Sequence, residues 1–515
     1  SFTIHCKSGA KRRYITRHLQ AALLVIISFR SLAPSHCRYV FNTLFKHRPD
    51  ARFTEPHNHR KRHCLIRIGN LGNIYFFVNP TPPLSLSFSF PNPVMVRCLP
   101  FFISLAAATN LYATHYDGNI YSLSLDDENS LSVTSSLKSC GDGPSWLTFD
   151  SSTRTMYCSD HAGNASMNGL LTSYSVDRNG RLTELAHTVD VGAAVHSVIY
   201  GGKHGREKYL AVAHYGGSAL STFALPLRSD KKPLEVFRYK MSQPGIKPRQ
   251  DSPHPHQVIL DPTGGFILVP DLGADQVRVY AIDLHSGHLN VCPSLNYTAG
   301  SGPRHGLFWK SNPSDSVTML YTVSELSGHF HAFVVSYLSS GCLAFKETQS
   351  FVPYPGGKLP AAGTPAELRM AGNSLYASIR FDQGFAPNDS MSTMACSSNG
   401  TVSFSQITSA YGTIPRTFAI NKKGTLVAIG DQASSNVAIV KRDPRGGTLG
   451  DLVANLQVGQ PGQASNSSSG LSSIIWEEDV EFVEQSSHAC VSAICMFACL
   501  LFAICWFVCY RLSIV

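Results

Sequence analysis

Short apolar runs alternate with polar turns along the middle of this chain, and the alternation recurs. The clearest copy runs from His256 to Tyr280, with two apolar runs, an Asp-Pro-x-Gly turn between them and a third run of alternating apolar and polar residues. Asp, Pro and Gly are the residues that tight turns require, and alternation is typical of a half-buried strand. The pattern therefore predicts a repeating unit of short strands.

The apolar run that opens this unit occurs six times, at starts about 50 to 60 residues apart. The six runs are Pro144–Asp150, His196–Tyr200, His256–Leu260, Arg304–Trp309, Ala366–Met370 and Arg416–Ile420. Strands near Leu111 and Asn119 lack such a run, and Leu471–Trp476 can supply it from the other end. We predict an all-β, seven-bladed β-propeller over residues 110–476, with ring closure by N- and C-terminal strands. No long amphipathic helix interrupts the pattern, which excludes Rossmann and α/β-barrel folds.

Positive charge is concentrated at the start of the chain. Residues 1–94 carry 14 Lys or Arg and two acids, so the net charge of +9 leaves the remainder at −3. The body has no basic stripe, and we expect no nucleic-acid partner. Residues 1–94 show no periodicity and are expected to be a basic extension rather than a domain. We favour translated non-coding sequence from a misplaced gene start, with a mitochondrial transit peptide as the alternative.

Residues 95–109 have the pattern of a secretory signal peptide: one positive charge, an apolar stretch and small residues at the end. The alternative is a short buried strand. Five Asn-x-Ser/Thr sequons follow, at Asn164, Asn296, Asn388, Asn399 and Asn466. They are weak support for a secreted or cell-surface glycoprotein. If residues 95–109 are not a signal, a cytoplasmic location is expected.

The cysteines and the tail complete the organisation. The body has five cysteines, at positions 140, 158, 292, 342 and 396, without a Cys-x-x-Cys pair, so an odd thiol remains and a zinc site is not expected. In the tail, 477–515, residues 489–509 form an uncharged run long enough to span a bilayer as a helix. It is interpreted either as a C-terminal membrane anchor or as read-through into an intron.

Four polar residues at the ends of predicted inner strands are candidates for chemistry: His256, Arg304, Glu325 and Arg380. His and Glu can exchange protons, and Arg can clamp a carboxylate or phosphate through two hydrogen bonds. Two arginines on one channel predict an anionic substrate. The alternative for each is structural: a capped turn, a loop brace, or a pairing of Glu325 with Arg304.

The run from Gly141 to Trp476 resembles the seven-bladed lactonase propeller family, which includes fungal carboxy-cis,cis-muconate cyclase and 6-phosphogluconolactonase. The resemblance is carried by His254-Pro-His256-x-Val-x-x-Asp-Pro, Val269-Pro-Asp-Leu-Gly-Ala-Asp275, Gly302-Pro-Arg-His305, Ser324-Glu-Leu326, Pro365-Ala-Glu-Leu-Arg369 and Ala213-His-Tyr-Gly-Gly217. It implies a His, two Arg and a Glu on the channel, which correspond to His256, Arg304, Arg380 and Glu325. Arg369 is an alternative to Arg380. We also expect His254, His305, Glu367 and Arg369 to contribute to substrate binding.

The implied reaction forms or opens a lactone. We prefer a cyclase-like isomerase (an intramolecular lyase), in which Arg304 and Arg380 orient carboxylates and either Glu325 or His256 donates the proton. The alternatives are a 6-phosphogluconolactonase-type hydrolase and a non-enzymatic surface glycoprotein. Neither reaction requires a metal or cofactor. The substrate, the direction of reaction and the oligomeric state are open at this point.

Overall fold

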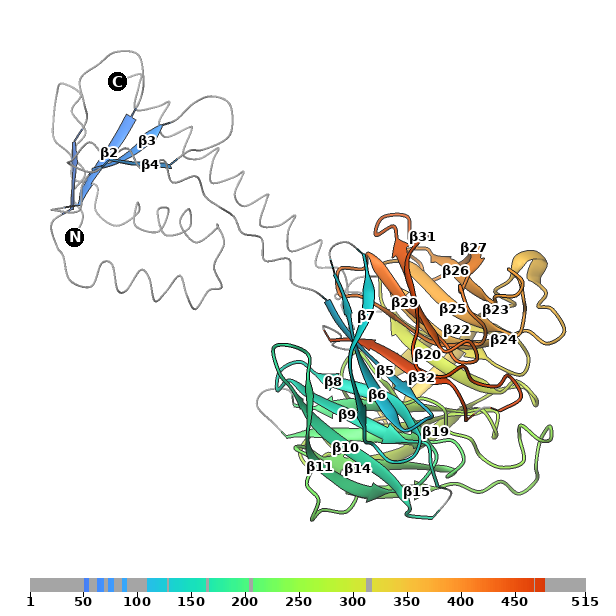
Figure 1. Ribbon diagram of the computed structural model, residues 1–515. Coiled ribbons are helices and arrows are strands. Elements are labelled where there is room, and N and C mark those ends of the chain that lie inside the picture. Colours follow the sequence, from blue (N-terminus) through green and yellow to red (C-terminus); the bar gives the residue numbers. More distant parts are fainter. Residues whose placement is uncertain are drawn as a thin grey trace. The chain divides into compact units, whose positions relative to one another are not determined.

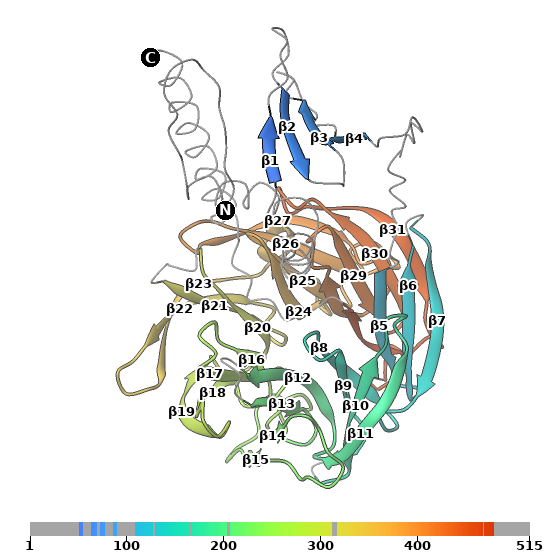
Figure 2. The same cartoon turned by 90° about the vertical axis from the view of Figure 1, so that its left-hand side faces the viewer.

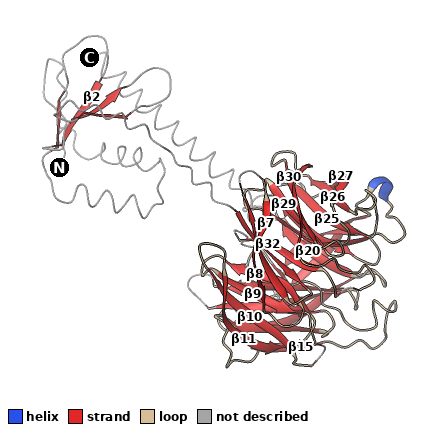
Figure 3. Ribbon diagram, viewed as in Figure 1, coloured by secondary structure: helices blue, strands red, loops and turns tan. Residues whose placement is uncertain are grey.

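The computed structural model describes residues 51–54, 63–68, 73–77, 86–89, 109–126, 129–163, 166–202, 207–311, 317–466 and 468–477. The chain divides into two compact units, Ser1–Leu105 and Ala106–Val515. Figure 3 shows that strands dominate the described residues, with one short helix, η3 (Pro355–Gly357). No helix among the described residues is long and apolar enough to cross a membrane. The predicted signal peptide, apart from Thr109, and the apolar segment 489–509 lie outside these residues.

The described part of the first unit is a small antiparallel sheet. Its strands follow one another in the order β1 (Ala51–Thr54), β2 (His63–Ile68), β3 (Asn73–Phe77) and β4 (Leu86–Ser89). These strands were not predicted from the sequence, in which residues 1–94 were expected to be a basic extension rather than a domain.

The described residues of the second unit form seven four-stranded antiparallel sheets, the blades of a β-propeller (Figures 1 and 2). In order from the innermost strand outward, blade 1 comprises β32 (Leu471–Trp476), β5 (Thr109–His115), β6 (Asn119–Leu125) and β7 (Leu131–Lys138); blade 2, β8 (Pro144–Asp150), β9 (Thr155–Asp160), β10 (Gly169–Val176) and β11 (Leu182–Asp190); blade 3, β12 (Ala194–Gly201), β13 (Lys208–His214), β14 (Ala219–Ala224) and β15 (Glu235–Arg238). In the same order, blade 4 comprises β16 (Ile259–Leu260), β17 (Phe266–Asp271), β18 (Gln276–Ile282) and β19 (Leu289–Asn296); blade 5, β20 (Pro303–Trp309), β21 (Thr318–Ser324), β22 (Phe330–Tyr337) and β23 (Leu343–Phe351); blade 6, β24 (Thr364–Ala371), β25 (Ser374–Arg380), β26 (Ser390–Cys396) and β27 (Val402–Ser409); blade 7, β28 (Pro415–Ile420), β29 (Leu426–Asp431), β30 (Asn436–Arg442) and β31 (Leu449–Gln457). The predicted seven-bladed fold is confirmed.

Ring closure in blade 1 is also confirmed. The C-terminal strand β32 pairs antiparallel with β5, Leu471 opposite His115 and Trp476 opposite Leu111. Trp476 is fully buried, and its indole nitrogen donates a hydrogen bond of 3.0 Å to the carbonyl of Ala419 in blade 7. The first and last strands of the propeller are thus joined within one sheet, which closes the ring.

Burial explains why the inner strands could be recognised in the sequence. Every residue of β8, β21 and β25 is buried, whereas most of β7 is exposed. Inner strands lie between neighbouring blades and therefore read as continuous apolar runs, as doubly covered strands do. Apolar clusters fill the space between blades, for example Leu123 of blade 1 with Ile439 of blade 7.

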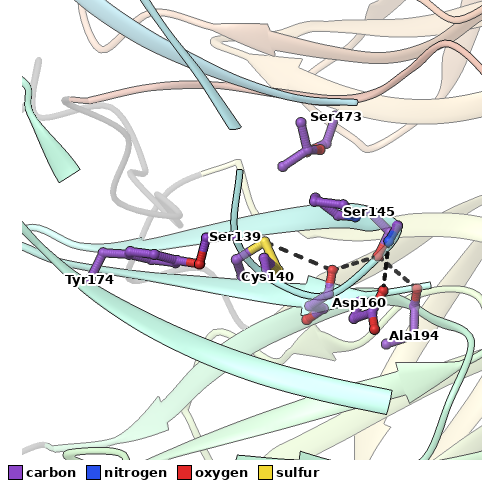
Figure 4. The surroundings of a disulfide bond; sticks show 12 residues. Ser139, Cys140, Ser145, Asp160, Tyr174, Ala194 and Ser473 are labelled. Atoms are coloured by element: carbon purple, nitrogen blue, oxygen red, sulfur yellow. Dashed lines mark hydrogen bonds between the residues drawn. A yellow bond between two sulfur atoms is a disulfide. The ribbon is translucent and has the colours of Figure 1, made fainter. Parts of the chain in front are cut away.

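Two disulfides connect successive blades. Cys140, in the loop that leaves blade 1, is bonded to Cys158 of β9 in blade 2, and Figure 4 shows its surroundings. Cys292 of β19 is bonded to Cys342, in the turn between β22 and β23. Among the described cysteines, Cys396 is the free thiol that the odd count requires, and it is buried.

Candidate active site

A β-bulge near the start of the innermost strand recurs around the ring. In blade 5, Pro303 pairs with Ser324 and His305 pairs with Val323, which leaves Arg304 as the extra residue. In blade 7, the same shift leaves Arg416 between Pro415 and Thr417. Bulges re-aim side chains and are frequent beside active sites.

Other blades place different residues at this bulge. Ser145, Val195 and Ser472 stand there in blades 2, 3 and 1. In blade 4, Pro255 bridges Asp271 as Pro303 pairs with Ser324, so His256 stands at the corresponding place.

The serines at this position join neighbouring blades. The hydroxyl of Ser145 donates to the carbonyl of Ala194 at 2.7 Å (Figure 4), and that of Ser472 donates to the carbonyl of Pro144 at 2.6 Å. The residue at this bulge therefore has a structural role in blades 1 and 2. In blades 4, 5 and 7 the corresponding residues are His256, Arg304 and Arg416.

Glu325 is the centre of a buried ion cluster. It follows β21 directly, its side chain is 1 % exposed, and its Oε2 atom lies 2.8 Å from Arg304 Nε and 2.8 Å from Arg380 Nη2. Its other oxygen pairs with Arg249, from the loop before blade 4. Burial raises the pKa of Glu325, but the charges of Arg380, Arg249 and Arg304 outweigh burial and lower this pKa to about 2. Glu325 is therefore a carboxylate at neutral pH.

The arginines keep hydrogen-bonding capacity beyond Glu325. Within the described residues, Arg304 Nη1 and Arg380 Nε are buried and have no hydrogen-bond partner. Burial, followed by the charge of Arg380, lowers the pKa of Arg304. Three guanidinium groups around one carboxylate leave an excess of positive charge with unused N–H donors, which suits an anionic ligand or a developing oxyanion.

Imidazoles and an indole lie beside this cluster. His256 and His305 are buried with ring centroids 5.3 Å apart, and His196 lies 5.7 Å from His305 and stacks on Trp146 at 4.1 Å. Burial and the charge of Arg304 hold the pKa of His256 well below its usual range, so its ring is neutral. His256 Nδ1 and His305 Nδ1 have no hydrogen-bond partner among the described residues.

The remaining candidates lie around this centre. His254 stacks on Tyr215 at 4.2 Å, and its ring nitrogens lie 2.8 Å from the Tyr215 carbonyl and 3.0 Å from Asp251 Oδ1. His254 thus braces Tyr215 and has both nitrogens occupied. Arg369 Nε donates to Glu367 Oε1 at 2.7 Å, and its guanidinium carbon lies 5.8 Å from the Trp146 ring centroid.

The sequence analysis missed several residues at this end of the ring. Arg249 completes the ion cluster, and Tyr116, His161 and Tyr215 line a pocket of about 420 Å³. Strand alignment could have found Arg416, which opens the last predicted inner strand as Arg304 opens an earlier one. Arg249 gave no such signal because its loop belongs to no repeat. In the described part of the chain, no three His, Cys, Asp or Glu side chains gather as metal ligands would.

Comparison with known proteins agrees with this architecture. The family described as "Lactonase, 7-bladed beta-propeller" matches residues 110–466, and the chain belongs to this family. A probable 6-phosphogluconolactonase of Arthroderma benhamiae is 30% identical over 308 residues, which cover 59% of this chain and 75% of that protein. The 6-phosphogluconolactonase of Bacillus subtilis is 23% identical over 66% of this chain and 92% of its own length. The solved structure of a Pseudomonas aeruginosa periplasmic gluconolactonase is 26% identical, with a TM-score of 0.56 over 71% of this chain and 98% of that one.

Proposed function

We propose that the chain is a lactone hydrolase that opens a small sugar-acid lactone in the propeller channel, as the names of its 6-phosphogluconolactonase and gluconolactonase relatives suggest. The observation that carries the proposal is the buried ion cluster in which Glu325 Oε2 lies 2.8 Å from both Arg304 Nε and Arg380 Nη2. Glu325 is ionised and His256 is neutral, so the site offers proton acceptors and N–H donors rather than a carboxylic acid. In hydrolysis a neutral His256 can accept a proton from water, whereas an ionised Glu325 cannot donate the proton that the preferred cyclase hypothesis assigned to Glu325 or His256.

In this mechanism His256 accepts a proton from a water molecule, and the resulting hydroxide adds to the lactone carbonyl carbon. The carbonyl oxygen becomes an oxyanion, which the unpartnered N–H groups of Arg304 and Arg380 stabilise. The ring C–O bond then breaks, and the departing alkoxide takes the proton from His256. One lactone and one water give one hydroxy acid.

Glu325 acts in this scheme as the fixed counter-charge that holds three guanidinium groups together. It leaves the cluster cationic overall, which favours an anionic substrate. A bound anion also offsets part of the positive charge that lowers the pKa of His256, and thereby makes the imidazole a better proton acceptor.

The test is hydrolysis by the full chain, followed by base consumption in a pH-stat. The substrates are 6-phosphogluconolactone and glucono-1,5-lactone, with 3-carboxy-cis,cis-muconate as the cyclase substrate, followed by ultraviolet absorbance. The proposal expects opening of at least one lactone, and a rate at least about 100-fold lower in Arg304→Gln. The matched control is Arg178→Gln, which alters an exposed turn. Consumption of the muconate alone would reverse the proposal in favour of the cyclase.

A second proposal concerns location. Disulfides form and persist in oxidising compartments, and two of them join successive blades here. We propose that the propeller matures along the secretory route that residues 95–109 predict. Secretion of the full chain from a eukaryotic host supports this, and retention of an intact chain in the cytosol contradicts it.

A further inference from the structure

Arg416 is a further cation at this end of the inner strands, apart from the three arginines that pair with Glu325. It occupies the bulge of blade 7 that Arg304 occupies in blade 5, and it is half-buried. This bulge puts it at the same end of the inner strands as Arg304, and its charge contributes to lowering the pKa values of Arg304, His256 and His305. The sequence pattern and the register thus bring a further arginine to this end of the ring.

Unlike its neighbours, Arg416 forms no ion pair with a carboxylate among the described residues. Arg304 and Arg380 pair with Glu325, and Arg369 pairs with Glu367. No carboxylate of the described residues lies within 4.0 Å of the Arg416 guanidinium, whose aromatic neighbour is the ring of Tyr116, 5.8 Å away at its centroid. A half-buried guanidinium that no described carboxylate neutralises can offer both its charge and its N–H donors to an anionic ligand.

Tyr116 provides an independent indication that a ligand binds beside Arg416. Its hydroxyl is buried and has no hydrogen-bond partner within the described part of the chain. Its ring meets His161 edge-on at 5.4 Å, and both residues line the pocket of about 420 Å³. Burial and the charge of Arg416 lower the pKa of His161 to about 4, so His161 is neutral. Exposed Asp142 also lines this pocket, and no ion pair of 4.0 Å or less joins it to Arg416 among the described residues.

We propose that Arg416 and Tyr116 form an anion subsite, which holds a carboxylate or phosphate group of the substrate remote from its reacting carbonyl. This inference rests on the proposed function, because it assigns the charged end of the same substrate. The guanidinium supplies charge and paired N–H donors, and the phenol supplies one further donor. Arg304 and Arg380, already paired with Glu325, are left for the reacting carbonyl.

The kinetic test compares wild type, Arg416→Gln, Arg416→Lys and the control Arg178→Gln on an anionic and a neutral lactone. With 6-phosphogluconolactone, Arg416→Gln is expected to raise KM by about 10- to 100-fold and to leave kcat within about threefold. With glucono-1,5-lactone, both constants should stay at wild-type values. Arg416→Lys should restore part of the loss, because it keeps the charge but not the paired geometry. Equal losses on both lactones, or no loss on either, would overturn the subsite.

A binding arm separates this inference from the proposed function. Isothermal titration of the same full-length proteins with 6-phosphogluconate, gluconate and inorganic phosphate requires no turnover. Wild type should bind 6-phosphogluconate at least about 10-fold more tightly than Arg416→Gln does. Loss confined to the two phosphates supports the subsite, whereas an equal loss of gluconate binding contradicts it, because the carboxylate of gluconate is formed from the reacting carbonyl. If neither lactone is hydrolysed but this difference remains, the hydrolase proposal fails and the subsite stands; if the variant binds as wild type does, the subsite fails.

Discussion

Replacement of Glu325 by Gln is the perturbation that the ion cluster makes most informative. The substitution keeps the size of the side chain and removes the charge that Arg304, Arg380 and Arg249 share. Three guanidinium groups then face one another without a counter-ion. Breaking a buried ion pair in this way costs about 3–5 kcal/mol, because the remaining charge stays buried.

The pKa of Glu325 gives a second route to this magnitude. Its pKa falls from 4.5 to about 2 in the folded protein. Because the folded value is the lower one, this contribution is complete above the unfolded value of 4.5 and is lost as the pH falls from there through the folded value. A shift of this size corresponds to about 3 kcal/mol at neutral pH. The two routes agree.

The assay is calorimetric unfolding of the full-length protein at neutral pH. For a propeller of roughly 370 residues, a loss of about 3–4 kcal/mol lowers Tm by about 4–5 °C. Inorganic phosphate should recover part of this loss in Glu325→Gln, since an anion that binds the folded cluster stabilises it by mass action. The control is Asp230→Asn, which breaks the exposed pair with Arg228 and should leave Tm close to the wild-type value. A Glu325→Gln protein as stable as wild type at neutral pH would refute the charge balance described for this cluster.

Three further predictions follow from the same structure. His256→Asn should lower kcat by about 100- to 10,000-fold with little change in Tm. In wild type, the acid limb of the kcat/KM–pH profile should lie below pH 6.5, because the pKa of His256 is lowered from that value. An acid limb above pH 6.5 would argue against His256 as the base. Replacing Cys292 and Cys342 together by Ser should reduce the free energy of unfolding by about 2–4 kcal/mol. Non-reducing peptide mapping of wild type should recover the two cysteines as a disulfide-linked pair. Recovery of both as free thiols would contradict the bond. Trp476→Ala should lower the free energy of unfolding by about 3–5 kcal/mol, because it removes buried packing and the hydrogen bond to the Ala419 carbonyl. Trp476→Phe should lower it less. Equal stability of wild type and the Ala variant in denaturant unfolding would contradict ring closure at this strand.

The fold could be predicted because inner strands are buried on both faces and so leave continuous apolar runs in the sequence. Closure by Leu471–Trp476 followed from counting, since one strand set lacked its opening run. The four short strands of residues 51–89 were not anticipated, because that stretch shows no regular alternation of apolar and polar residues.

The candidate site was predictable only in part. Arg304, Glu325 and Arg380 lie at the ends of repeated strands, and the structure brings them within ion-pair distance. The protonation of Glu325 depends on how many cations pack around it, and Arg249 comes from a loop that carries no periodic signal. The sequence alone therefore could not show whether the Glu325 side chain is a carboxylic acid or a carboxylate, which bears on its role as a proton donor.

The most direct test of the proposed function is the initial rate at which the full-length protein opens 6-phosphogluconolactone in a pH-stat, measured beside His256→Asn at equal concentrations of folded protein. Our account predicts rapid base consumption by wild type and a rate at least about 100-fold lower for the variant. Equal rates for the two proteins, or a folded wild type that opens neither this lactone nor glucono-1,5-lactone, would contradict it.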